Sequence, residues 1–265
     1  MLRALYTSAT GMKAQELVID NTANNLANVN TNGFKRSQVD FADLLYLTSQ
    51  KAGTEVAVGQ PTPIGLQIGS GARAVGTTKL FTPGVFEQTG NPTDVAIEGD
   101  GFFKIALPSG EFRYTRDGAF RTDATGRLVS TDGYLLDSGI TIPDGIIPSS
   151  VRIGSDGTVT GLQSGSPDTV APLGQILLVR FQNPAGLSSE GGNLYATTPA
   201  SGPEVQDVPG SNGLGTLRQS FLERSNVEVV TELITLISAQ RAYEINSRAI
   251  RAADEMLSVS SEIVR

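Results

Sequence analysis

The most constraining feature of this sequence is an apolar residue at every seventh position along its C-terminal segment. No glycine or proline interrupts residues 216–265. A seven-residue apolar repeat is typical of helices that pack along a narrow seam, whereas a strand has a period of two. The pattern therefore predicts a helix of about 35–40 residues. Its heptad positions are Leu222, Val229, Leu236, Tyr243, Ile250, Leu257 and Val264.

A polar segment marks the predicted start of this helix. Ser225 or Asn226 can serve as the N-cap, because a short polar side chain can accept a hydrogen bond from the first unpaired backbone N–H groups. Glu228 lies where it can complete a capping box with Ser225. Further apolar side chains widen the stripe, namely Leu233, Ile237, Ala239, Ala253 and Met256.

The N-terminal segment carries a second heptad stripe. Gly11 and several threonines lower its intrinsic helicity, so we expect this helix to form against a partner. Either each terminal helix packs on the central domain, or the two helices pair with each other and with copies in neighbouring subunits. The narrow stripes favour the second interpretation. The stripe comprises Leu2, Leu5, Ala9, Met12, Ile19, Ala23 and Leu26, with Glu16 as its one charged member.

The middle of the chain is predicted to be an antiparallel β domain. Residues 101–116 are predicted to form two strands joined by a turn at residues 108–110, and residues 173–181 to form one buried strand. Short strands with frequent turns are typical of an antiparallel sandwich or barrel. Asp-Gly pairs, which favour tight turns because glycine tolerates positive φ, occur at 100–101, 117–118, 132–133, 144–145 and 156–157.

The predicted fold class is α+β. The N- and C-terminal heptad helices form a coiled-coil-like terminal domain, and a mostly antiparallel β domain is inserted between them. The predicted N-terminal helix covers residues 1–32, an extended connector or β-ribbon covers 33–74, the β domain covers 75–215, and the C-terminal helix covers 216–265.

The composition argues against most kinds of active site. The chain has no cysteine and no histidine, which removes the usual nucleophiles, general bases and metal ligands. The segment 69–74 matches a dinucleotide-binding fingerprint in its glycines, but no helix is expected after it. We therefore predict no catalytic residue, no cofactor and no metal. Carboxylates, which in pairs can hydrolyse glycosides or bind calcium, gather at Asp94, Glu98, Asp100, Glu111, Asp117 and Asp123, and three of these aspartates lie in or beside turn signals.

Charge and hydropathy argue against two further classes of partner. The net charge is −7 and the one adjacent basic pair is Lys35-Arg36, which we interpret as a solvated loop end, so no nucleic-acid binding is expected. The N-terminal residues lack the apolar core of a secretory signal, and no apolar run approaches the ~20 residues that span a bilayer. We expect a protein that is not membrane-embedded and that leaves the cytosol, if it does, without a cleaved signal.

Several segments resemble a known family. Residues 23–37, ANNLANVNTNGFKRS, and residues 225–257, SNVEVVTELITLISAQRAYEINSRAIRAADEML, resemble the N- and C-terminal signatures of the bacterial flagellar rod and hook axial proteins. The segments GLQIGSGARAV, EGDGFFKI, YTRDGAF and GYLL resemble the distal-rod members of that family in particular. The similarity covers nearly the whole chain and is weakest at residues 46–64 and 182–213.

The resemblance implies a structural subunit of the flagellar basal body that serves motility. It implies export in an unfolded state through the flagellar type III apparatus and helical polymerisation into a rigid hollow tube, the periplasmic rod that reaches the outer membrane. It further implies torque transmission to the hook and contacts with copies of the chain, proximal rod proteins, the hook protein and the P-ring and L-ring proteins. We expect the apolar stripes to form the contacts between subunits, and both chain ends to be disordered in the free monomer.

Six asparagines between residues 21 and 32 lie where the first helix is predicted to end. Asparagine is unfavourable inside a helix, because its amide competes for backbone hydrogen bonds. We interpret the segment as the exit of the chain from the helical domain, in which the amides cap the last carbonyls and bridge to neighbouring backbone. Replacing Asn25 and Asn28 by alanine should then weaken polymerisation more than folding. The exit motif comprises Asn24, Asn25, Asn28, Asn32, Gly33 and Phe34, with Asn32 and Gly33 forming the turn and Phe34 an apolar anchor.

Three alternatives stay open at this point. The chain can be another rod or hook protein of the same family. It can be a peptidoglycan-cleaving enzyme that uses carboxylates of the β domain. It can also be a secreted adhesin with helical oligomerisation ends.

Overall fold

The structure is a computed structural model that describes residues 2–51, 53, 55–57, 60–61, 63–163 and 166–263. The chain divides into two compact units. The helical unit contains residues 1–27, 37–78 and 228–265, and the β unit contains residues 28–36 and 79–227. The β unit is therefore an insertion between segments that fold together at the two chain ends.

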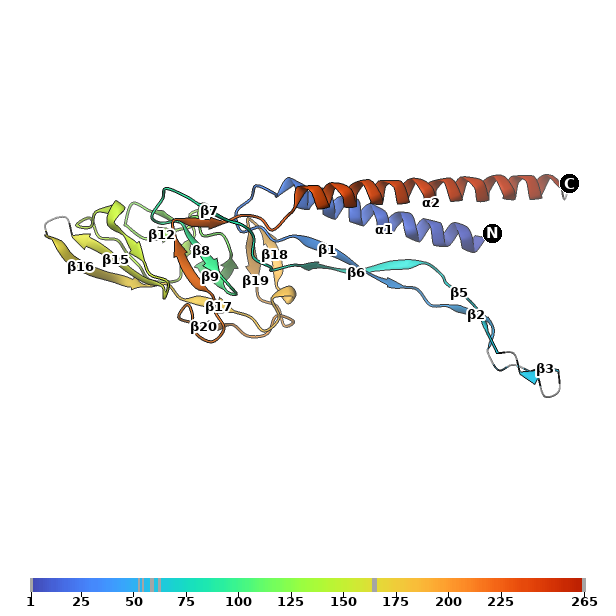
Figure 1. The fold of residues 1–265 in the computed structure, drawn as a ribbon, viewed down its shortest axis with the longest axis horizontal. Helices are drawn as coiled ribbons and strands as arrows, with labels where there is room; N and C mark the ends of the chain where they lie inside the picture. The colour runs from blue at the N-terminus through green and yellow to red at the C-terminus, as the bar shows by residue number, and fades with distance from the viewer. Residues whose placement is uncertain are drawn as a thin grey trace. The chain divides into compact units, whose positions relative to one another are not determined.

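Two long helices, α1 (Leu2–Ala27) and α2 (Val229–Ile263), lie side by side in the helical unit (Figure 1). Their presence confirms the prediction of a helix near each chain end. α1 ends five residues earlier than the predicted residue 32, and α2 is 35 residues long. The last predicted stripe residue, Val264, lies outside the described residues.

The prediction that the C-terminal helix begins at residue 216 is wrong. Residues 216–223 instead form β21 (Thr216–Gln219) and β22 (Phe221–Glu223). β21 pairs antiparallel with β8 (Val95–Glu98), and β22 pairs antiparallel with β7 (Phe86–Gln88). These partners satisfy the backbone groups that a helix would have satisfied internally. Leu222 of the predicted stripe is consequently a strand residue.

The predicted capping box at the start of α2 is also wrong. The Ser225 hydroxyl accepts a hydrogen bond from the Val227 N–H at 3.3 Å, so it closes a local turn before the helix. The first helical backbone bond runs from the Glu232 N–H to the Glu228 carbonyl at 3.0 Å. The Glu228 carboxylate accepts a hydrogen bond from the Thr231 hydroxyl at 2.8 Å. Glu228 therefore occupies the cap position itself.

The described residues between 37 and 79 form a β-ribbon, one of the two forms expected for the connector (Figure 1). Its strands pair in nested fashion, β1 with β6, β2 with β5 and β3 with β4. β6 begins within the glycine-rich segment at residues 69–74, so a strand and not a helix follows the apparent dinucleotide fingerprint. The bounds are β1 (Ser37–Asp43), β2 (Leu47–Gln50), β3 (Glu55–Ala57), β4 (Gln60–Pro61), β5 (Leu66–Ile68) and β6 (Ala72–Lys79).

The largest sheet among the described residues lies in the β unit. It runs in the order β11–β12–β13–β9–β10–β19–β18, and β17 pairs with both β9 and β20. Every strand pairing in it is antiparallel. Its strands are β9 (Phe102–Ala106), β10 (Phe112–Thr115), β11 (Arg121–Thr122), β12 (Leu128–Val129), β13 (Leu135–Leu136), β17 (Leu178–Arg180), β18 (Ser188–Gly191), β19 (Leu194–Ala196) and β20 (Val205–Asp207).

The hairpin predicted over residues 101–116 is confirmed, because β9 and β10 pair with Phe112 opposite Ala106. The single strand predicted over residues 173–181 is wrong. Its first part belongs to β16 (Ser166–Gln175), which lies in a separate sheet of order β14–β15–β16, and its last part is β17. The remaining elements are β14 (Arg152–Ile153), β15 (Thr158–Gln163) and the short 3-10 helices η1 (Pro148–Ser150) and η2 (Pro184–Gly186).

β9 is buried on both faces and supplies side chains to two apolar clusters. Because successive strand residues point to opposite faces, Phe103 and Ile105 enter the larger aliphatic cluster, whereas Phe102 enters an aromatic one. Phe103 packs edge-to-face on Phe120 with ring centroids 5.0 Å apart. Phe102 is likewise 5.9 Å from Tyr195. These two clusters form the apolar core of the β unit.

Candidate assembly site

The two helices contact each other through small and polar side chains. A Cβ atom placed on Gly11 would lie 3.1 Å from Asn246 Nδ2, so the helices approach closely at this point. Asn246 lies midway between Ala239 and Ala253 and continues their seven-residue spacing. The buried residues of the two helices, among the side chains that the structure describes, are Ala14, Thr22 and Asn25 in α1 and Glu232, Ala239 and Ala253 in α2. We call this set the seam.

The predicted apolar stripes overlap the seam only in part. Ala239 and Ala253, which widen the C-terminal stripe, are buried in the seam. None of the heptad positions whose side chains are described is buried. Leu5, Met12, Ile19, Leu26, Leu222, Leu236, Ile250 and Leu257 are half-buried, and Ala9, Val229 and Tyr243 are exposed. The side chain of Leu2 lies outside the described residues, as Val264 does. The first turns of α2 add exposed apolar side chains at Val230, Leu233, Ile234 and Ile237.

Two of the asparagines tie the end of α1 to the start of the ribbon. The side-chain amides of Asn21 and Asn25 both donate to the Ser37 carbonyl, at 2.7 and 2.9 Å. The Ser37 N–H donates back to Asn25 Oδ1 at 2.9 Å. Asn25 also donates to the buried Glu232 carboxylate at 3.3 Å, and it is 0 % exposed. These bonds give the amides the bridging role that the sequence suggested, within the helical unit itself.

The other asparagines of the motif have different positions. Asn24 lies on the exposed side of the last turn of α1. Asn28 closes a turn in which the Thr31 N–H donates to its carbonyl and the Thr31 hydroxyl donates to its Oδ1, both at 3.2 Å. The Asn32 carbonyl accepts from the Asn193 amide at 2.8 Å.

Gly33 and Phe34 are both buried in the β unit. Gly33 has φ +68°, and a Cβ atom there would lie 2.6 Å from the Asp117 nitrogen. Its N–H donates to the Glu223 carbonyl at 2.7 Å. The position therefore demands glycine on both conformational and steric grounds. The ring of Phe34 lies 4.9 Å from the ammonium of Lys79.

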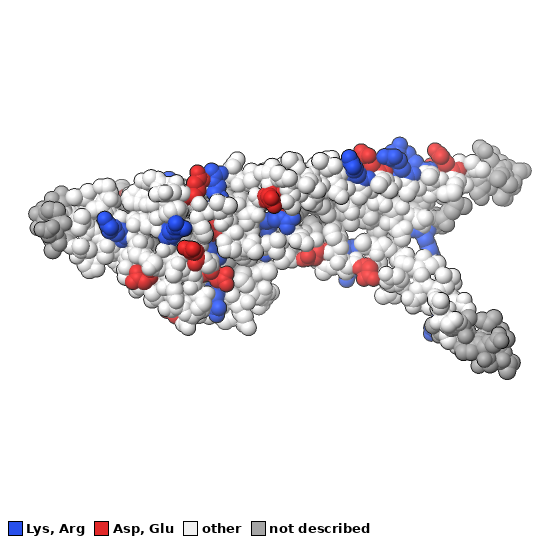
Figure 2. All heavy atoms as spheres, viewed as in Figure 1, with Lys and Arg blue, Asp and Glu red and all other residues white. Residues whose placement is uncertain are grey.

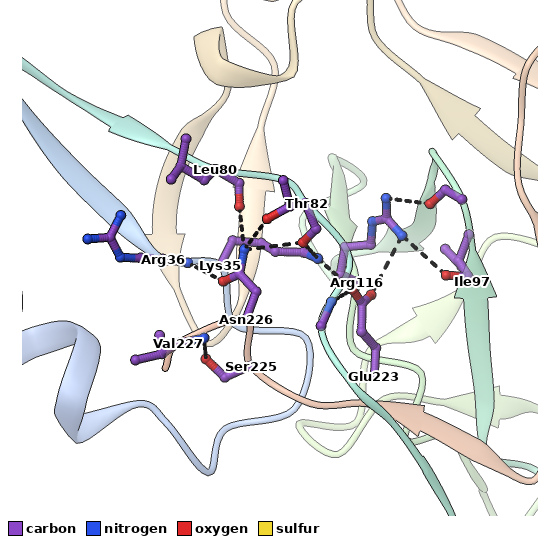
Figure 3. Close-up of polar contacts among 12 residues, drawn as sticks. Lys35, Arg36, Leu80, Thr82, Ile97, Arg116, Glu223, Ser225, Asn226 and Val227 are labelled. Carbon is purple, nitrogen blue, oxygen red and sulfur yellow. Dashed lines mark hydrogen bonds and ion pairs between the residues drawn. The ribbon is translucent and has the colours of Figure 1, made fainter. Parts of the chain in front are cut away.

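A buried cluster of charged residues follows directly, and Figure 3 shows its members. Lys35 Nζ lies 2.5 Å from Glu223 Oε1, and both side chains are 0 % exposed (Figure 3). Lys35 also donates to the Thr82 carbonyl at 2.8 Å. Arg116 Nη1 lies 3.6 Å from Glu223 Oε2, and Arg116 Nη2 donates to the Gly99 carbonyl at 2.8 Å. We call Lys35, Arg116 and Glu223 the junction cluster.

The electrostatics of the junction cluster are unbalanced, since one carboxylate faces two cations. Burial lowers the pKa of Lys35, and the nearby Glu223 carboxylate opposes that shift. Burial likewise lowers the pKa of Arg116, again against the pull of Glu223. Arg116 Nε and Glu223 Oε2 have no hydrogen-bond partner among the described residues. Loss of the Glu223 carboxylate would therefore leave two buried positive charges without their nearest counter-ion, and the carboxylate of Asp100 would be the remaining negative charge that acts on both.

A neighbouring set of hydrogen bonds, centred on Asn226, joins three segments of the chain. Asn226 Oδ1 accepts a hydrogen bond from the Arg36 N–H at 2.7 Å, and its amide donates to the Leu80 carbonyl at 2.9 Å (Figure 3). The same amide donates to the Thr82 hydroxyl at 2.9 Å. Asn226 is thus not the N-cap of α2 but a link between residues 36, 80–82 and 226.

The interpretation of Lys35 as a solvated residue is wrong, and sequence reasoning missed Arg116 and Glu223 altogether. Lys35 is buried because Gly33 and Phe34 draw the chain into the β unit before it turns outward. The three members are separated by up to 188 residues, and none stands in a recognisable charge pattern. No local signal in the sequence could have joined them.

The carboxylates of the β unit are used in turns and ion pairs. Asp123 Oδ1 accepts the backbone N–H groups of Thr125 and Arg127 at 2.8 and 2.9 Å, which holds the pKa of Asp123 below its usual range. Asp94 Oδ1 accepts from Arg121 at 3.0 Å. Burial raises the pKa of Asp117, whose Oδ1 accepts from a backbone N–H two residues on. Within the described part of the chain, no three acidic side chains are grouped to hold a metal ion.

Surface charge is mixed on the face shown in Figure 2. Basic and acidic side chains lie next to one another along α2, with uncharged surface around them. No helix in the described ranges is both long enough and apolar enough to cross a membrane. The pattern gives no continuous basic field on the visible face.

Three family models match the sequence. The model described as "Flagella basal body rod protein" matches residues 5–35, which cover most of α1 and the exit motif. The model described as "Flagellar hook protein FlgE/F/G D1 domain" matches residues 96–161 in the β unit. The model described as "Flagellar basal body rod FlgEFG protein C-terminal" matches residues 218–263, which include α2.

Curated relatives match over their whole length. The "Flagellar basal-body rod protein FlgG" of Borreliella burgdorferi is 46% identical over 265 residues, which is 100% of each chain. The protein of the same name from Buchnera aphidicola subsp. Schizaphis graminum is 44% identical and covers 99% of this chain and 100% of its own. The "Flagellar hook-basal body complex protein FlhP" of Bacillus subtilis is 30% identical over 99% of this chain and 100% of its own.

Proposed function

The chain belongs to the family of flagellar basal-body rod and hook proteins, and on this premise we propose that it forms the distal rod. It is a structural subunit of the flagellar basal body and not an enzyme, so the peptidoglycan-cleaving alternative is rejected. Its assembly into the flagellar axial structure, and hence its service to motility, follows from the family.

The finer role is our proposal. The subunits polymerise helically into a rigid hollow shaft that crosses the periplasm, passes through the P and L rings and transmits torque from the motor to the hook. The shaft joins the proximal rod proteins at one end and the hook protein at the other. The chain reaches this place through the flagellar type III export apparatus, and its terminal helices become ordered on assembly.

The incomplete burial of the apolar side chains of α1 and α2 is the observation that carries this proposal. The buried positions of the two helices hold Ala, Thr, Asn and Glu, whereas the larger apolar side chains are half-buried or exposed in a single chain. Ile234 is 63% exposed and Tyr243 is 41% exposed. Uncovered apolar surface of this extent marks an interaction site. A second copy of the chain is the natural occupant, because a rod of many identical subunits brings the same helices together.

The test is self-assembly of the purified chain, followed by electron microscopy of concentrated samples. The wild-type chain should form straight tubes. A variant with Ile234→Ser and Tyr243→Ser should form none. In dilute samples, where neither protein is assembled, its far-UV circular dichroism should match that of the wild type, because neither side chain is buried in the single chain. Gln240→Ser, at an exposed polar position between them on the same helix, is the matched control and should assemble normally.

Two outcomes would contradict the proposal. Tubes of normal length from the double variant would show that the stripes are not the contacts between subunits. A wild-type chain that stays monomeric at every concentration would contradict self-assembly through its own helices.

A further inference from the structure

The sequence contains two Asn-Gly pairs, at residues 32–33 and 212–213, and the structure places them in very different surroundings. An Asn-Gly pair can modify itself. The backbone nitrogen of the glycine attacks the side-chain Cγ of the asparagine, because glycine has no side chain to hinder the approach. The two pairs therefore form an internal comparison within one chain.

The chemistry needs water and no other reagent. The glycine nitrogen loses its proton to solvent and bonds to Cγ, and the bond from Cγ to Nδ2 breaks. Nδ2 gains a proton and leaves as ammonia, which produces a five-membered succinimide. Water then adds to one of the two imide carbonyls and breaks its bond to nitrogen. Opening at Cγ gives aspartate, and opening at the backbone carbonyl gives isoaspartate.

The pair at residues 32–33 is protected from this reaction. The Gly33 N–H donates to the Glu223 carbonyl at 2.7 Å, so its nitrogen is engaged. Gly33 is buried, and a Cβ atom there would lie 2.7 Å from the Arg116 carbonyl carbon. The nitrogen can reach Asn32 Cγ only if this packed region of the β unit opens. Such openings approach the free energy of global unfolding.

The pair at residues 212–213 is open to the reaction. Both residues are exposed and both have positive φ, +49° and +76°, as in the tight turns of type I′. The turn is closed by the Leu214 N–H, which donates to the Ser211 carbonyl at 2.8 Å. Among the described residues, nothing accepts a hydrogen bond from the Gly213 N–H. A surface turn closed in this way opens at low cost.

A cation lies beside the glycine of the reacting pair. A Cβ atom placed on Gly213 would lie 2.9 Å from Arg180 Nη1, so the guanidinium is next to this residue. A neighbouring positive charge favours the deprotonated amide nitrogen that attacks, and it favours the oxyanion that forms on Cγ.

We propose that Asn212 is a site of spontaneous deamidation, promoted by Arg180, and that Asn32 is not. The change has a local consequence, because the Asn212 amide donates a hydrogen bond to the Asp207 carboxylate. Deamidation removes that donor and adds a second negative charge beside the first. The loop between β20 and β21 is then loosened in older molecules. This inference goes beyond the rod function and does not depend on it.

The experiment incubates the folded full-length chain in ¹⁸O-labelled water at mildly alkaline pH and locates the incorporated label by peptide mass spectrometry. Conversion at Asn212 should be more than about tenfold faster than conversion at Asn32. A tenfold ratio requires only that the turn around Asn212 opens at a free energy about 1.4 kcal/mol lower than the region around Asn32 does. In urea-unfolded chain the two rates should become similar. Comparable rates in the folded chain would overturn the proposal, as would an intact Asn212 when the unfolded chain reacts.

Two variants sharpen the test. Arg180→Gln should slow conversion at Asn212 in the folded chain without changing Asn32, and an unchanged rate would overturn the role given to the cation. Asn212→Asp reproduces one product, and it should accelerate hydrogen exchange of the amides at residues 208–215 relative to wild type. Unchanged exchange there would refute the loosening of the loop.

Discussion

The junction cluster gives the sharpest prediction, which concerns the substitution Glu223→Gln. Glutamine has the shape of glutamate and keeps an oxygen that can accept from Lys35 and from the Gly84 N–H, which Glu223 Oε1 accepts at 2.9 Å. It removes only the negative charge. Lys35 and Arg116 then remain as two cations with side chains 0% and 1% exposed.

The expected magnitude is large. Removal of one partner from a buried ion pair typically costs about 3–5 kcal/mol, because the remaining charge stays desolvated. That is a substantial part of the ~5–15 kcal/mol by which a typical protein is stable. The neighbouring pair Arg224–Glu87 offers a matched control, because its side chains are 40% and 54% exposed. Glu87→Gln should therefore change the unfolding free energy much less than Glu223→Gln does, because solvent screens an exposed pair.

The assay is urea unfolding followed by tyrosine fluorescence, since Tyr114 and Tyr195 lie in the aromatic cluster of the β unit. The double variant Lys35→Met with Glu223→Gln removes one charge of each sign, and it should recover part of the loss. A double-mutant cycle then gives the coupling between the two residues. The reasoning is refuted if Glu223→Gln lowers the unfolding free energy no more than Glu87→Gln does.

Two further predictions follow from the same contacts. Asn25→Ala should destabilise the helical unit by about 1–3 kcal/mol, because it leaves the Ser37 N–H without its side-chain acceptor. Asp20→Ala, at an exposed position of the same helix, is the control, and thermal unfolding by far-UV circular dichroism measures both variants. The pKa of Lys35 lies below its ordinary value of 10.5, so between the two values the unfolded chain binds more protons and the unfolding free energy should rise with pH. Urea titrations in that pH window should show the rise in wild type, and an equal rise in Lys35→Met would contradict it.

The prediction for Asn25 revises the interpretation drawn from the sequence. There, replacement of Asn25 and Asn28 was expected to weaken polymerisation more than folding. Asn25 is buried against Ser37 and Glu232 within one chain, so its loss acts on folding first. Asn28 lies in a turn, half-buried, and the expectation stays a prediction there.

Sequence patterns correctly predicted the elements that are determined by residues close together in the chain. The Asp-Gly pairs at 132–133, 144–145 and 156–157 form turns, because the glycine tolerates the backbone angles of a tight turn without help from distant residues. The hairpin at residues 101–116 follows from two strand-like runs on either side of a turn that Gly110 permits with φ +87°. The two terminal helices follow from sustained heptads. Each of these needs only neighbours in the chain.

Elements that depend on pairing with residues far away in the sequence could not be predicted from such patterns. Residues 216–223 have no helix breaker, yet β7 and β8, more than a hundred residues earlier, capture them as strands. The Asp-Gly pair at 117–118 makes no tight turn; a Cβ atom on Gly118 would lie 1.6 Å from the Val95 carbonyl oxygen, so this glycine serves a close contact between segments. The junction cluster is a third example, because its charges meet only in the folded chain.

The seam and the apolar stripes have different roles, and this difference connects the fold with the proposed function. Full burial of one large aliphatic side chain contributes about 1.5–3 kcal/mol, whereas the alanines and the glycine of the helix pair have little apolar area to bury. A pair joined this way fixes its register through Asn25 and Glu232 rather than through a large apolar contact, as single polar residues do in coiled coils. Part of the apolar area of the two helices therefore remains available to other chains. The ordering of the terminal helices is then coupled to assembly into a shaft. The same apolar contacts between neighbouring subunits both stabilise the helices and join the subunits.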